Sequence, residues 1–145
     1  MAIQWKAGLL GAASGIALAH AMSTVFMPLF TSAIGMSSNP LAAVKASLAV
    51  NLIYANLALS LLSAGIGGFV GARLAKSHPV LHGLLSASIQ ALLYLAGLAF
   101  APFISFGSFV VAALTAASGA AGGYVASRRL KTVVTDSLDE KRSNL

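Results

Sequence analysis

The sequence contains no cysteine and almost no acidic residues: three among 145 positions. The lack of cysteine excludes disulfides, thiolate catalysis and thiolate metal sites. All three acids lie close to the end of the sequence, so the apolar stretches offer no carboxylate for acid–base catalysis or ion coupling. Neither a glycine-rich phosphate loop nor a Ser-x-x-Lys or Ser/His/Asp set at a suitable depth is present. These absences predict a protein that is not an enzyme.

Charge of either sign is also scarce. Charged residues make up 8% of the chain and apolar residues 58%, against about 25% and about 45–50% in soluble domains. A soluble domain of this composition would expose large apolar patches, which predicts an integral membrane protein. The formal charge of +6 comes from basic residues that form no long run, so a nucleic-acid partner is not expected.

Four apolar stretches are each near or above the ~20 residues that a membrane-spanning helix needs. They cover residues 7–34, 48–72, 79–101 and 105–127. The sequence therefore predicts an all-α bundle of four transmembrane helices within residues 1–131. Residues 132–145 hold all the acids, and we interpret them as a charged, solvated cytoplasmic tail.

Proline marks the expected helix ends. Ser38-Asn39-Pro40 and Ser77-His78-Pro79 are typical of an N-cap followed by proline at the first helical position. Ala101-Pro102 predicts the end of the third helix. Pro28 is expected to kink or end the first helix, because proline removes a backbone donor.

Basic residues predict the orientation. They flank the first span at Lys6, the second and third at Arg73 and Lys76, and the fourth at Arg128, Arg129 and Lys131. Alternating spans place these six on one side and leave only Lys45 opposite. The positive-inside rule then predicts both termini in the cytoplasm.

A second interpretation of the first span is a cleaved signal peptide. Lys6, the apolar run 7–18 and small residues around position 19 fit that pattern. Apolar character continues through Phe30, which favours a retained span. Cleavage would leave three spans.

An internal repeat joins two of the predicted spans. Residues 63–76 align without gaps to residues 118–131, sharing Ser, a Gly-Gly pair, Val, Arg and Lys, with Phe69 opposite Tyr124. Both copies end even-numbered spans. This predicts two helical hairpins related as parallel repeats, with chance similarity between Gly/Ala-rich helices as the alternative.

Glycine pairs at a spacing of four favour close helix packing. They are Gly11 and Gly15, Gly67 and Gly71, and Gly119 and Gly123. We interpret them as internal packing faces of the bundle, with an exposed partner-binding face as the alternative.

Basic residues at the helix ends suit lipid headgroups. Arg73 and Arg128 each follow an aromatic residue by four positions, and Lys76, Arg129 and Lys131 lie at the same end. We expect snorkelling to anionic headgroups. The sharper hypothesis is a pair of lipid-phosphate sites.

Polar residues inside the spans are the usual markers of function in membrane proteins. Counting ~1.5 Å per residue places four of them near the membrane midplane: His20, Asn56, Gln90 and Thr115. They are expected to form one cluster, acting as structural hydrogen-bonding groups or as a site for a small ligand.

The three histidines do not predict a cofactor or metal. His20 lacks a second imidazole at matching depth for haem. His78 and His82 share one helix face at a spacing of four but lack a third ligand, so both are interpreted as histidines at the membrane interface.

The run Gly67-Gly-Phe-Val-Gly-Ala-Arg73-Leu-Ala, followed by Pro79-x-x-His82-Gly83, resembles a stretch of small four-helix bacterial inner-membrane proteins. The resemblance covers about twenty residues and implies a bacterial inner-membrane location. It implies no activity and supplies no catalytic residues.

Three functions fit these features. The leading hypothesis is a non-catalytic accessory or structural subunit, in a larger membrane complex or a homo-oligomer, in contact with anionic lipid. The alternative is a small transporter for an uncharged or anionic solute that uses the midplane cluster. A holin-like pore, supported by chain size and basic ends, is the third.

Overall fold

Four long helices make up the described part of the chain. The computed structural model describes residues 4–35, 42–75, 77–99 and 106–143. These form α1 (Trp5–Gly35), α2 (Ala42–Leu74), α3 (Pro79–Ala99) and α4 (Phe106–Ser143). Each contains a segment long and apolar enough to cross a membrane: Trp5–Phe26, Ile53–Leu74, Pro79–Leu98 and Phe106–Arg129. The predicted all-α bundle of an integral membrane protein is confirmed.

Two of the four proline signals can be compared with the structure. α3 begins at Pro79 as predicted, after His78, whose φ of 49° turns the chain out of α2. Pro28 does not end α1, which continues to Gly35. Membrane helices tolerate proline where neighbouring groups satisfy the freed carbonyl. The signals at 38–40 and 101–102 lie outside the described residues.

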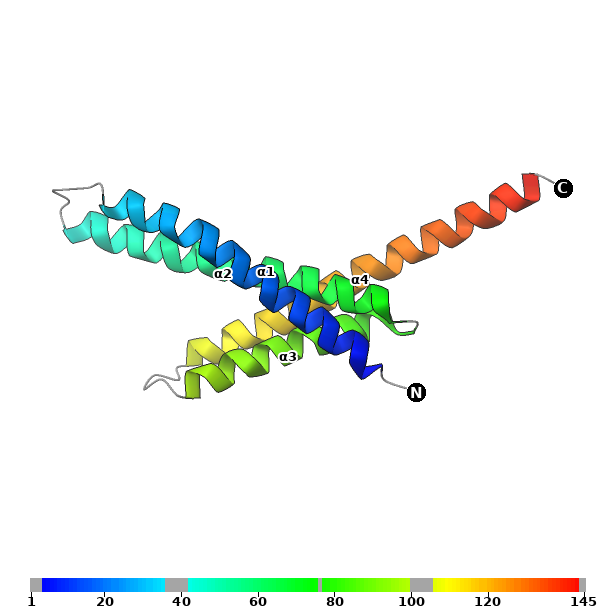
Figure 1. The fold of residues 1–145 in the computed structure, drawn as a ribbon, viewed down its shortest axis with the longest axis horizontal. Helices are drawn as coiled ribbons and strands as arrows, with labels where there is room; N and C mark the ends of the chain where they lie inside the picture. The colour runs from blue at the N-terminus through cyan, green and yellow to red at the C-terminus, as the bar shows by residue number, and fades with distance from the viewer. Residues whose placement is uncertain (1–3, 36–41, 76, 100–105, 144–145) are drawn as a thin grey trace.

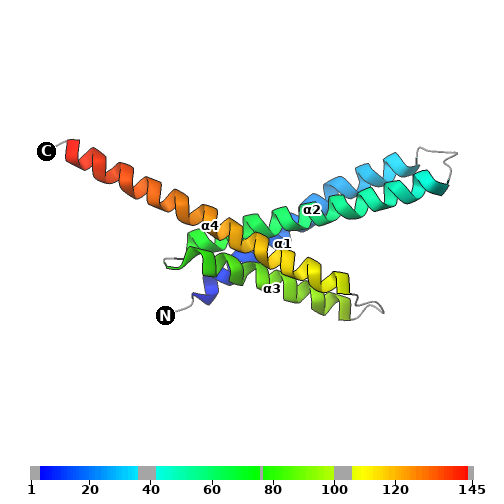
Figure 2. The ribbon, with the colours of Figure 1, turned by 180° about the vertical axis from the view of Figure 1, so that it is seen from behind.

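The helices form two hairpins, α1–α2 and α3–α4, that cross (Figure 1). At the crossing α2 contacts α4, α1 contacts α3, and α2 also contacts α3. α1 and α4 make no contact over the part of the chain described. On one side of the crossing the hairpins diverge, as Figure 2 shows from behind. We call the space between the diverging hairpins the fork.

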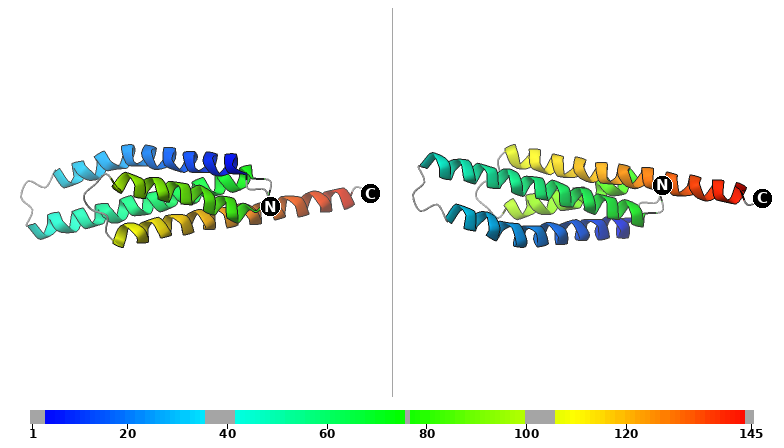
Figure 3. Two further views of the ribbon diagram at one scale, coloured as in Figure 1. Left: turned by 90° about the horizontal axis from the view of Figure 1, so that it is seen from below. Right: turned by 90° about the horizontal axis from the view of Figure 1, so that it is seen from above.

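Both ends of the described chain lie on the other side of the crossing, together with the α2–α3 turn (Figure 1). α4 projects beyond the other helices there (Figure 3). The projecting part of α4 includes most of the predicted tail, because this helix continues to Ser143.

The two copies of the repeat pack against each other at the crossing. A Cβ built on Gly68 of α2 would lie 2.7 Å from the Cα atom of Gly119 on α4. The Ser118 hydroxyl donates to the Leu61 carbonyl across the same interface at 2.6 Å. The hairpins are not symmetric, however, because α2 contacts α3 whereas α1 does not contact α4 among the described residues.

Small residues fill the interior. Every buried apolar side chain in the described chain is an alanine, while large residues such as Leu92 (65% exposed) and Phe106 (84% exposed) face outward. All six glycines of the three predicted pairs are buried. Lipid solvates large apolar side chains, so association depends on close backbone contact and dispersion. Small residues allow that contact.

Replacing a crossing glycine therefore tests the fold. In Gly68→Ala the new methyl would meet the Gly119 backbone, which cannot move aside, and overpacking of this kind costs about 1–3 kcal/mol. We expect a lower midpoint when the variant is unfolded with SDS and followed by circular dichroism. Gly97→Ala is the matched control, because nothing lies within 4 Å of its Cβ position. Equal midpoints for the two variants would contradict the packing described.

Candidate functional site

One face of α3 carries a stripe of buried polar residues. His82, Ser86 and Gln90 follow one another at a spacing of four and are 1%, 0% and 9% exposed. This spacing aligns side chains on one face of a helix. The stripe packs against the glycine faces of α1 and α2, because a Cβ on Gly15 or Gly67 would meet Gln90, and one on Gly11 or Gly71 would meet Ser86.

His82 joins the start of α1 to the start of α3. The Gln4 backbone N–H donates to its Nε2 at 3.1 Å, which satisfies a donor at a helix end that has no intrahelical partner. Its Nδ1 lies 3.0 Å from the His78 carbonyl oxygen. Acceptance at Nε2 places the ring proton on Nδ1, where it donates to that carbonyl.

Neither ring nitrogen of His82 is left for a metal. Among the described residues no group of three histidine, cysteine or acidic side chains gathers at one point. His82 lies in the first turn of α3, near the end of the span, and is buried among the helices at 1% exposed. Its spacing of four from Ser86 and eight from Gln90 was the available signal for a buried stripe.

Gln90 differs from the other two residues of the stripe, because its side-chain donor, the buried Nε2 atom, has no hydrogen-bond partner in the described structure. Ser86 donates to the His82 carbonyl of its own helix at 2.9 Å. The amide is held between two glycines: a Cβ on Gly67 would lie 2.8 Å from Nε2, and one on Gly15 would lie 2.7 Å from Oε1. An unsatisfied buried donor costs about 1–3 kcal/mol.

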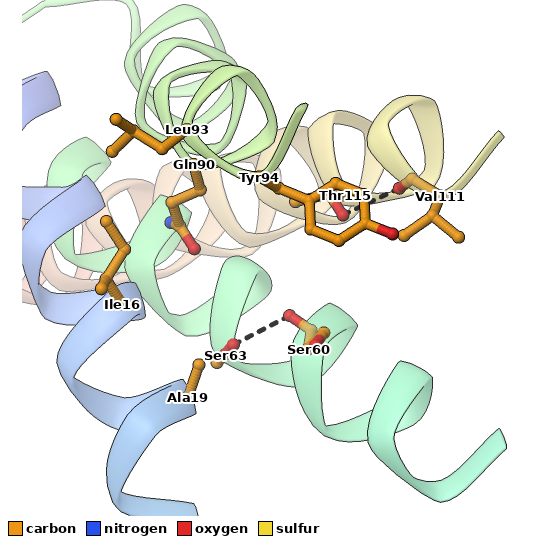
Figure 4. Close-up of a pocket in the computed structure, with 9 residues that line it drawn as sticks. All are labelled: Ile16, Ala19, Ser60, Ser63, Gln90, Leu93, Tyr94, Val111 and Thr115. Carbon is orange, nitrogen blue, oxygen red and sulfur yellow. Dashed lines mark hydrogen bonds between the residues drawn. The ribbon is translucent and has the colours of Figure 1, made fainter. Parts of the chain in front are cut away.

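A cavity of about 330 Å³ lies beside Gln90, where the fork begins (Figure 4). All four helices contribute to its walls. The Ser63 hydroxyl donates to the Ser60 carbonyl and the Thr115 hydroxyl to the Val111 carbonyl, each at 2.8 Å. These two hydroxyls thus donate hydrogen bonds within their own helices. Only their oxygen lone pairs are left, and these can accept a hydrogen bond from another group.

The structure brings together two of the four predicted midplane residues. Gln90 and Thr115 line the cavity, whereas His20 and Asn56 do not and are exposed. His20 follows the buried Gly15 by five residues, about 140° around α1. Asn56 precedes Ser60 by four residues, one turn along α2, and does not line the cavity.

The basic residues lie at one end, as expected for the repeat. The Arg73 guanidinium lies 5.4 Å from the centroid of the Phe69 ring, and that of Arg128 lies 4.9 Å from the Tyr124 ring. Both are cation–π contacts, and the two copies of the repeat adopt the same one. Arg129 is exposed, and the side chains of Lys76 and Lys131 fall outside those described.

Comparison of the chain with family models, curated proteins and solved structures gives no match. The function is therefore inferred from the residues and their geometry. Three observations bear on it: a cavity with an unsatisfied amide, two polar side chains exposed within the spans, and paired arginines at one end.

Gln90→Met tests whether the amide is unsatisfied. Methionine keeps the length of the side chain and removes the donor without a partner, so we expect stability to rise by about 1 kcal/mol. SDS unfolding followed by circular dichroism measures the change. Ser118→Ala is the matched control, because it removes a satisfied interhelical bond and should lower stability by about 0.6 kcal/mol. A loss of stability in Gln90→Met would show that the amide has a partner.

Proposed function

We propose that this chain is a non-catalytic integral membrane subunit that assembles with other membrane proteins or with further copies of itself. The observation that carries the proposal is the exposure of His20 and Asn56, both inside the apolar segments that span the membrane. Polar side chains at such depth almost always face protein or a water-filled cavity rather than lipid. A protein partner against α1 and α2 would give these two side chains that environment.

The transporter alternative has less support. It requires His20, Asn56, Gln90 and Thr115 along one solute path, and two of them lie away from the cavity that the other two line. A holin-like pore requires an open polar lining through the molecule, whereas the buried polar residues of α3 pack directly against the glycines of α1 and α2. Close packing of small residues suits a rigid helical scaffold.

The location and the lipid contacts belong to the same proposal. We place the protein in a bacterial inner membrane, on the strength of the resemblance in residues 67–83, with both termini in the cytoplasm. Lys6, Arg73, Arg128 and Arg129 lie toward the same end of the bundle, and the positive-inside rule assigns that end to the cytoplasm. Anionic headgroups would meet the exposed arginines there.

Purification in a mild detergent followed by native mass spectrometry tests assembly. We expect the wild-type chain to travel in a larger complex or homo-oligomer. His20→Leu combined with Asn56→Leu should release it, because the polar contacts to the partner are lost. Leu92→Ala, at an exposed apolar position of α3, is the control and should keep the complex. A wild-type protein recovered only as a monomer would overturn the proposal.

Anionic lipid that co-purifies with the protein tests the arginine pair. Each basic residue at the membrane surface contributes about 1 kcal/mol of attraction, so Arg73→Gln with Arg128→Gln should lower the bound anionic lipid. Lys6→Gln with Arg129→Gln removes the same charge from exposed positions that have no cation–π contact among those described. The same loss of lipid in both variants would show general charge attraction rather than two arginine sites.

A further inference from the structure

The geometry points to a ligand site in the cavity at the base of the fork. Its ligand is an uncharged lipophilic molecule with a carbonyl group that accepts a hydrogen bond from the Gln90 amide. This goes beyond assembly, because the cavity lies between the helices and includes neither His20 nor Asn56.

The first argument is the amide itself. Gln90 is 9% exposed, lines the cavity and leaves its Nε2 without a partner. The two ends of an amide have nearly the same shape, so a half-turn exchanges nitrogen and oxygen in the same space. After that exchange the oxygen would face the Cα–H groups of Gly15 and Gly67, which are weak donors. The nitrogen would then face the cavity and need an acceptor there.

The second argument is the character of the walls. None of the residues described around the cavity is charged, and most of the wall is apolar, including Ile16, Leu93 and Val111. Burial of an ion against such walls would be costly. The Ser63 and Thr115 hydroxyls already donate to their own helices, whereas the buried Gln90 amide keeps a donor without a partner among the described residues. The Ser60 and Tyr94 hydroxyls also line the cavity. An uncharged carbonyl on an apolar body matches this arrangement.

The third argument is access and depth. Leu93 and Tyr94 line the cavity and are 56% and 43% exposed, so this wall reaches the lipid-facing surface. Gln90 lies eleven residues beyond Pro79, about 16 Å along α3, which is near the middle of a hydrocarbon core of about 30 Å. The ester carbonyls of phospholipids remain near the headgroups. A separate lipophilic ketone or quinone-like molecule reaches this depth.

Benzophenone is a suitable probe, because it is an uncharged aryl ketone that attaches to nearby C–H groups under light. The full-length chain, in phosphatidylcholine vesicles, would be irradiated with increasing benzophenone and the attachment sites mapped by peptide mass spectrometry. We expect saturable labelling of cavity residues such as Ile16 and Leu93. Gln90→Met should raise the half-saturating concentration about fivefold, the effect of one lost hydrogen bond.

Two further variants complete the test. Ala19→Phe fills the cavity from α1 and should abolish saturable labelling while Gln90 is kept. Asn51→Leu removes an exposed amide of α2 that does not line the cavity and should leave labelling unchanged. Labelling spread evenly over exposed residues in every variant would overturn the site. Saturable cavity labelling that is unchanged in Gln90→Met would overturn the role of the amide.

Discussion

Close backbone contact at glycine is the constraint on which the rest of this structure depends. In lipid, large apolar side chains gain nothing by leaving the surface, so helices associate where their backbones can approach. Here Gly11 contacts Gly67 within the α1–α2 hairpin, and Gly68 contacts Gly119 between the two hairpins. The buried apolar side chains of the described chain are accordingly all alanine, and large residues such as Leu92 and Phe106 face outward.

The same glycines make room for polar groups. With no side chains of their own, Gly15 and Gly67 admit the Gln90 amide, and Gly11 and Gly71 admit Ser86. His82 and Ser86 have hydrogen-bond partners, but the amide nitrogen of Gln90 has none in the part of the chain described. Beyond this level the hairpins diverge, and the cavity forms beside the amide. The close crossing and the opening of the fork are thus two consequences of one packing arrangement.

Much of this fold follows from local sequence. The four spans come from apolar length, the start of α3 from Pro79, and the contact of the repeated segments is consistent with their shared glycines. Of the two outcomes expected at Pro28, a kink or a helix end, the end does not occur, because α1 continues to Gly35; membrane helices tolerate such prolines. The angle between the hairpins depends on all four helices at once, and no local pattern encodes it.

The sequence indicates only part of the candidate site, because local patterns give depth along a helix but not the packing of the four helices. Depth along a helix can be counted from the sequence; it placed Gln90 and Thr115 at a similar level, and both line one cavity. The rotation of α1 about its axis, which turns His20 outward, and the exposure of Asn56 on α2 depend on packing. The burial of His82 could have been inferred from its spacing to Ser86 and Gln90.

Disulfide crosslinking of α2 to α4 tests the crossing most directly, since the natural chain has no cysteine. A Cβ on Gly65 would lie 3.1 Å from the Ser118 Oγ, so Gly65→Cys with Ser118→Cys should crosslink within one chain when membranes are oxidised. Gly97→Cys with Ser118→Cys is the control and should not, because a Cβ at Gly97 would meet nothing from another helix within 4 Å. Absence of the first crosslink, or equal yields for both pairs, would contradict the crossing at these small residues.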